Sequence, residues 1–67
     1  METYTVLSYH KTNENSTYLV AVCDNLIIAQ RYADMEAREM KDYQIRIYKR
    51  IMNARFDTFE TLVYQIN

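Results

Sequence analysis

The chain has 67 residues, of which 49% are hydrophobic and 25% are charged, and its formal net charge is −1. This length accommodates one small domain, and the apolar content together with the low net charge excludes a disordered chain. Cys23 is the single cysteine, which excludes an internal disulfide scaffold. No apolar run approaches the roughly 18 residues of a membrane helix, and the first residues lack the pattern of a signal peptide. We therefore expect a cytosolic protein.

The N-terminal third predicts two strands joined by a polar loop. Residues 2–9 are rich in Thr, Tyr and Val, and residues 17–23 form a nearly continuous apolar run. The intervening residues 10–16 are polar and contain two asparagines, which is typical of a hairpin loop. Asp24 then predicts a helix start, because its carboxylate can cap the first backbone N–H groups.

A helical period begins at Leu26 and continues to about residue 40. Its main apolar face consists of Leu26, Ala29, Ala33, Ala37 and Met40, and the residues expected to broaden this face are Ile28, Tyr32 and Met35. Three alanines in the centre of the face indicate a close approach to a sheet.

The C-terminal third changes to a period of two, which predicts strands at 43–51 and 59–66 around a loop at 53–58. A single helix over 26–55 is the alternative, because the chain contains no glycine or proline to interrupt it. We reject that alternative because Ile45, Tyr48 and Met52 would then lie on the polar side of the helix.

The predicted fold class is therefore α+β, a two-layer ββαββ domain with a four-stranded sheet and one helix packed on one face. This order of elements resembles the β-grasp fold of ubiquitin-like domains and of small immunoglobulin-binding bacterial domains. The resemblance implies that the first and last strands lie side by side and parallel at the centre of the sheet. It carries no implication for function, since no sequence motif supports it.

Hairpin pairing predicts which side chains lie opposite the helix. If Met52 pairs with Phe59, then Ile45 and Ile47 lie on the core face opposite Ile66 and Tyr64, with Lys49 opposite Leu62. The opposite face then carries the pairs Arg46–Gln65, Tyr48–Val63 and Arg50–Thr61. The first hairpin does not sort as cleanly, because either of its faces carries large apolar side chains. One sheet surface is therefore expected to remain open and partly apolar.

Catalytic chemistry finds little support in these residues. His10 and Cys23 are expected at opposite ends of one hairpin, more than ~20 Å apart at the usual rise of a strand, which is too far for a nucleophile pair. Glu36 and Glu39 lack a second catalytic group, although Glu36 lies near the apolar face and can reach Lys49 or a tyrosine hydroxyl. A tetrahedral metal site fails on its ligand count. The absence of glycine excludes phosphate-binding loops. We expect no enzyme, no metal and no cofactor.

Binding is the expected function, because seven tyrosines and a clustered set of arginines suit recognition surfaces. The residues expected to bind on the open sheet face are Arg46, Tyr48, Arg50, Val63 and Gln65. The expected partner is another protein or, in a homodimer, a second copy of the chain; no membrane is expected. In style, such small glycine-free proteins resemble accessory products of phages and mobile elements that inhibit host proteins.

The alternative function is single-stranded nucleic-acid binding. Five of the eight basic residues fall within positions 41–55, which contain one acid, Asp42. Tyr48 between Arg46 and Arg50 resembles a strand that stacks bases and contacts phosphates.

Overall fold

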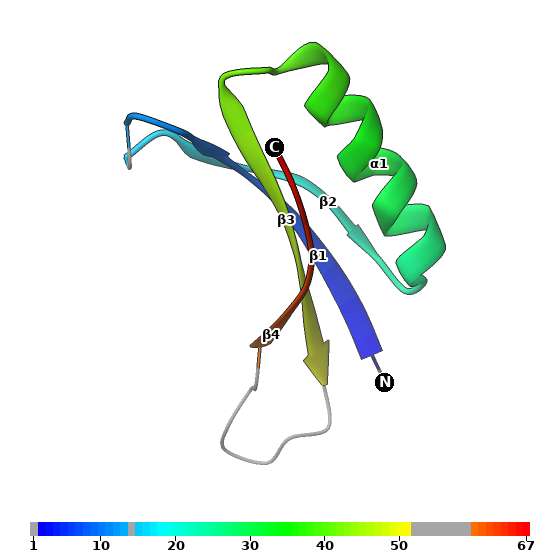
Figure 1. The fold of residues 1–67 in the computed structure, drawn as a ribbon. Helices are drawn as coiled ribbons and strands as arrows, with labels where there is room; N and C mark the ends of the chain where they lie inside the picture. Colours follow the sequence, from blue (N-terminus) through cyan, green and yellow to red (C-terminus); the bar gives the residue numbers. More distant parts are fainter. Residues whose placement is uncertain (1, 14, 52–59) are drawn as a thin grey trace.

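A computed structural model describes residues 2–13, 15–51 and 60–67, which form an antiparallel sheet with one helix on one face (Figure 1). The elements are β1 (Glu2–His10), β2 (Thr17–Cys23), α1 (Leu26–Glu39), β3 (Tyr43–Ile51) and β4 (Glu60–Ile66). The predicted two-layer ββαββ fold is confirmed, and so is the change from helix to strand before residue 43. The predicted loop at 53–58 and the Met52–Phe59 pair lie outside the described residues.

The strand order is β2-β1-β3-β4, which differs from the arrangement implied by the β-grasp resemblance. β1 and β3 occupy the centre and run antiparallel, pairing from Glu2 opposite Ile51 to His10 opposite Tyr43. β4 is an edge strand beside β3 and does not contact β1 in the sheet. The two nine-residue strands thus pair along their whole length, and the two seven-residue strands lie at the edges. A central ladder between the longest strands satisfies the most backbone groups.

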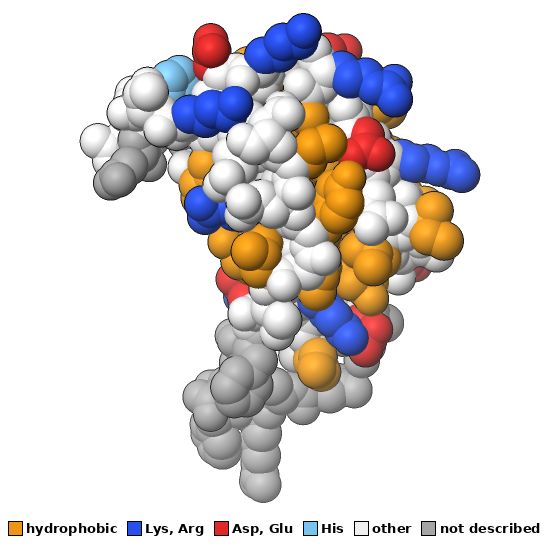
Figure 2. Space-filling view, viewed as in Figure 1, with side chains coloured by type: hydrophobic (Ala, Val, Ile, Leu, Met, Phe, Trp, Pro, Cys, Tyr) orange, Lys and Arg blue, Asp and Glu red, His pale blue; other side chains and the backbone are white. Residues whose placement is uncertain are grey.

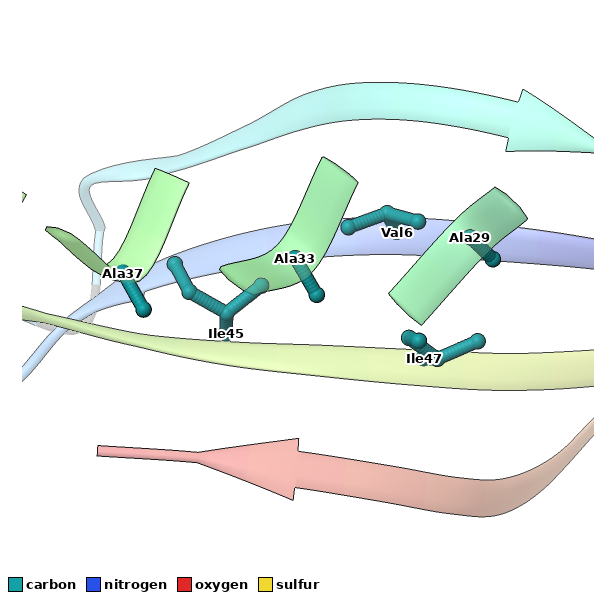
Figure 3. Close-up of a cluster of buried hydrophobic side chains, with 6 residues drawn as sticks. All are labelled: Val6, Ala29, Ala33, Ala37, Ile45 and Ile47. Atoms are coloured by element: carbon teal, nitrogen blue, oxygen red, sulfur yellow. The ribbon is translucent and has the colours of Figure 1, made fainter. Parts of the chain in front are cut away.

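The core lies between α1 and the two central strands. Val6, Ile45 and Ile47 are fully buried beneath the helix. Ala29, Ala33 and Ala37 face them from α1, as Figure 3 shows, and are also buried. Because alanine adds only a methyl group, the helix backbone can approach the sheet closely, and the larger side chains of the strands fill the space between the layers.

The helix begins at Leu26 as predicted, but its cap is one residue later than predicted. Asn25 is the N-cap: its backbone is extended, and its Oδ1 accepts hydrogen bonds from the amides of Ile27, at 2.8 Å, and Ile28, at 3.3 Å. Asp24 was the predicted cap. Both residue types can cap, but the cap must immediately precede the first helical residue, which is Leu26.

The outer side of α1 departs from the predicted pattern. Ile28, Tyr32 and Met35 were expected to widen the buried face, yet they are 43%, 46% and 57% exposed. The small alanines allow the helix to lie so flat on the sheet that only a narrow face is covered. Within the described residues, no helix combines the length and apolarity required to cross a membrane.

Candidate functional site

The sheet surface opposite α1, called the open face here, has no second layer of described residues over it. It is formed by Thr3, Thr5, Leu7, Tyr9, Leu19, Val22, Gln44, Arg46, Tyr48, Arg50, Glu60, Leu62 and Gln65. Residues directly opposite one another in an antiparallel ladder point to the same side, so these side chains follow from the register. The open face has an apolar middle and two polar ends.

The apolar middle crosses the sheet from one edge to the other. Val22 pairs with Thr5, Thr5 with Tyr48, and Tyr48 with Leu62, so one row passes over all four strands. Val22 is 59% exposed and Leu62 is 46% exposed, while Leu19 in the neighbouring row is 58% exposed. We call this row and the adjacent Leu19–Leu7 pair the apolar band.

Two irregularities in the edge strands determine which residues enter the apolar band. In β2 the register shifts between the Val6–Ala21 pair and the Leu7–Leu19 pair, leaving Val20 as an extra residue. A β-bulge of this kind changes which side chains face the helix in the rest of the strand. As a result Ala21 and Cys23 pack toward the core, whereas Val22 moves to the open face.

Because of the second irregularity, in β4, the observed C-terminal register differs from the predicted one beyond Ile47. Arg46–Gln65 and the core pair Ile47–Tyr64 are confirmed, but Tyr48 pairs with Leu62 because the register shifts after Ile47. The structure also pairs Lys49 with Thr61 and Arg50 with Glu60, in place of the predicted Lys49–Leu62 and Arg50–Thr61 pairs. Val63, the predicted partner of Tyr48, is the residue skipped by the ladder and is 36% exposed. Leu62, which pattern reasoning assigned to the core face, takes its place.

Arg46 contacts three neighbouring side chains on the open face. Its Nε donates to Gln44 Oε1 at 2.8 Å, and its Nη1 donates to the Tyr48 hydroxyl at 3.4 Å. Its guanidinium carbon lies 4.4 Å from the centre of the Tyr9 ring, within the range of a cation–π contact. Burial raises the pKa of Tyr9, the adjacent Tyr48 raises this pKa further, and Arg46 acts in the opposite direction. Sequence reasoning missed Tyr9, which lies next to Arg46 because β1 pairs with β3, and Gln44, which precedes Arg46 by two residues on the same face of β3.

The other basic side chains of β3 are paired with acids. Arg50 Nη2 lies 3.0 Å from Glu60 Oε1, and Lys49 Nζ lies 3.1 Å from Glu2 Oε1. The ion pair with Lys49 lowers the pKa of Glu2, and Glu2 raises the pKa of Lys49. The predicted site residues Arg46, Tyr48, Arg50 and Gln65 therefore occupy one face, but only Arg46 among the two arginines lacks an acidic partner within the described residues.

The residues considered for catalysis lie apart. Cys23 pairs with Tyr4 near the start of β1, whereas His10 ends that strand. Burial raises the pKa of the Cys23 thiol, and Asp24 adds to the effect, which disfavours the reactive thiolate. Glu36 accepts a hydrogen bond from the Tyr18 hydroxyl, one of the contacts that its position predicted. No cluster of three potential metal ligands occurs in residues 2–13, 15–51 and 60–67.

A second exposed apolar surface lies on α1. Ile28, Tyr32 and Met35 line a hollow of about 270 Å³ together with Arg31. Figure 2 shows exposed hydrophobic side chains over the middle of the molecule, with several Lys and Arg side chains above them. Any experiment on the open face therefore needs a control on the helix.

Comparison with known proteins does not identify the chain: no family model, curated protein sequence or solved structure matches it. The interpretation of the open face consequently depends on its own geometry.

Proposed function

We propose that this protein is a small, non-enzymatic interaction module of the cytosol that binds another protein through its open face. The observation that carries the proposal is the apolar band, in which Val22, Leu19 and Leu62 remain about half exposed or more. Placing such side chains against a partner removes apolar surface from water at roughly 25 cal/mol per Å². Contiguous exposed apolar surface with polar ends is characteristic of protein interfaces.

The chemistry of the central residues supports a protein partner. Tyr48 lies in the middle of the row, with apolar or β-branched neighbours on either side and Arg46 bonded to its hydroxyl. Tyrosine and arginine are enriched among the residues that dominate binding energy, because both combine a large contact area with polar groups. A regulatory protein that inhibits a host target, of the kind encoded by phages and mobile elements, would use such a face; a homodimer would bury it against a second copy.

The proposal can be tested with two matched tyrosine variants. The immobilised protein is used to capture partners from its native host, and captured proteins are identified by mass spectrometry. Tyr48→Ala should then weaken binding of the purified partner, or self-association, by roughly 5- to 150-fold, as loss of a central aromatic anchor does. Tyr32→Ala removes an exposed tyrosine from α1 and should leave the affinity unchanged. Arg38→Ala is a second control on the polar side of the helix.

The opposite pattern would refute the proposal. If Tyr32→Ala abolishes binding and Tyr48→Ala does not, α1 is the binding element. Circular dichroism melting of each variant separates lost binding from lost folding, since a surface substitution is expected to change stability by no more than about 0.5 kcal/mol.

Single-stranded nucleic-acid binding is a second candidate, favoured by the stacking of Arg46 on Tyr9 beside Tyr48. It is weaker because Glu60 neutralises Arg50 on the open face, and because Lys49 lies on the helix side of the sheet, paired with Glu2. Salt distinguishes the two functions: nucleic-acid affinity falls steeply with ionic strength, whereas binding through the apolar band changes little.

A further inference from the structure

A basic hollow of about 430 Å³ lies at the polar end of the open face. It is lined by Tyr9, His10 and Lys11 at the end of β1 and by Gln44 and Arg46 at the start of β3. The β1–β3 ladder brings these two short segments together, since Tyr9 pairs with Gln44 and His10 with Tyr43. The hollow adjoins the apolar band, because Arg46 pairs with Leu7.

Among the described residues, the lining contains cationic groups and no acid. Lys11 and Arg46 have no carboxylate within 4.0 Å among the described residues, in contrast to Lys49 and Arg50. Asp42 lies nearby and accepts the Lys11 amide through its backbone carbonyl at 2.9 Å, but it is not part of the lining. Two positive charges that share one concave surface, with no acid beside them in the described part of the chain, favour an anion.

The side chains of Arg46 and His10 are held in place before any ligand arrives. Gln44 fixes Arg46 Nε, Tyr48 fixes Nη1, and the Tyr9 ring supports the guanidinium plane, so Nη2 remains as a donor without an acceptor in the described part of the chain. His10 Nδ1 accepts the backbone amides of Thr12, at 3.2 Å, and Asn13, at 3.1 Å, which places the ring proton of a neutral His10 on Nε2. Pre-positioned donors lose little conformational entropy on binding.

We propose that the basic hollow receives an Asp or Glu carboxylate of the partner protein, on a segment whose neighbouring side chains are apolar and cover the apolar band. This inference rests on the proposed function and specifies its partner. A carboxylate matches the charge of Lys11 and Arg46 and forms charge-assisted hydrogen bonds with donors of this kind. A nucleic acid fits less well, because its next phosphates would meet leucine side chains and the acid-paired Arg50.

The test is an NMR titration of the ¹⁵N-labelled protein with two probe peptides at millimolar concentration. The peptides are N-acetylated and C-amidated Leu-Glu-Leu and Leu-Gln-Leu, which differ only in the carboxylate. The acidic peptide should shift the amides of Tyr9, Lys11 and Arg46 and bind at least ~10-fold more tightly than the neutral peptide, because hydrogen bonds to a charged group are about twice as strong. Lys11→Gln and Arg46→Gln should each remove most of this difference.

Lys41→Gln is the charge-matched control, because Lys41 is exposed in the turn before β3 and does not line the hollow. Equal binding of both peptides, or no shifts in the hollow, would refute the carboxylate site. A short oligothymidylate that shifts the same amides more strongly than the acidic peptide would also overturn it and favour phosphate recognition. The proposed function is judged separately: partner binding that depends on Tyr48 but not on Lys11 or Arg46 would leave the interaction module intact and remove the hollow from it.

Discussion

Shortening Ile47 tests the packing that supports the open face. Ile47 is fully buried, lies opposite Val6 and Tyr64 in the sheet, and packs beneath the helix alanines (Figure 3). Ile47→Val removes one methylene group and should lower the free energy of unfolding by about 0.5–1.5 kcal/mol; Ile47→Ala leaves a larger cavity and should cost about 2–5 kcal/mol. A domain of this size has only a few kcal/mol in total, so the alanine variant should be largely unfolded.

Urea denaturation followed by circular dichroism measures both changes. Ile51→Ala is the matched control, because Ile51 belongs to the same strand but is 45% exposed. Its midpoint should shift far less than that of Ile47→Ala. Two results would contradict the placement of Ile47 at the centre of the core. One is an equal loss of unfolding free energy in the two alanine variants, and the other is a melting temperature of Ile47→Ala within a few degrees of the parent.

Three further predictions concern the cysteine, the helix cap and alkaline pH. Cys23→Ala should cost ~1 kcal/mol of packing and leave partner binding unchanged; loss of binding in a folded Cys23→Ala protein would restore a chemical role for the thiol. Asn25→Ala should lower the free energy of unfolding by ~1 kcal/mol in urea denaturation, and Asp24→Ala by less, because Asn25 accepts the two first-turn amides. The hydrogen bond to Asp34 and, to a smaller extent, burial raise the pKa of Tyr64 from its usual value of 10.0. The stabilisation that this tyrosine gives the folded state is therefore complete below pH 10 and is lost as the pH rises through the folded-state pKa. Denaturation at pH 8 and pH 11 should show that loss, and Tyr64→Phe should reduce it.

Local sequence patterns were sufficient to predict the elements and the central core. The alternation of Ile45 and Ile47 with polar residues predicts the buried side of β3, and the spacing of the alanines predicts the side of the helix that packs on the sheet. These signals depend on neighbours within one element, where the periods of strand and helix apply directly. The order of the strands depends on pairing between distant segments, and the β-grasp resemblance therefore gave the wrong neighbours for β1.

The composition of the open face was predicted less well, because it depends on irregular pairing. Leu62 and Val63 exchange their expected roles through one skipped residue in β4, and Val22 reaches the open face through one skipped residue in β2. A regular period of two cannot reveal such a shift. The exposure of Tyr32 and Met35 has a different origin. The sheet covers only the narrow helix face around the three alanines, and hydropathy alone does not show the width of that face.

The two bulges and the Arg50–Glu60 ion pair together give the open face a direction. The bulges in β2 and β4 bring Val22 and Leu62 to the two edges of one row, and Tyr48 lies between them. At one end of the sheet Glu60 compensates the charge of Arg50. At the other end Arg46 has fixed donors but no acid within 4.0 Å among the described residues. A partner bound to the apolar middle can therefore distinguish the two ends by charge, and we expect its acidic group at the Arg46 end. This polarity provides orientation as well as affinity, because reversing the partner would leave its carboxylate opposite an arginine that is already paired.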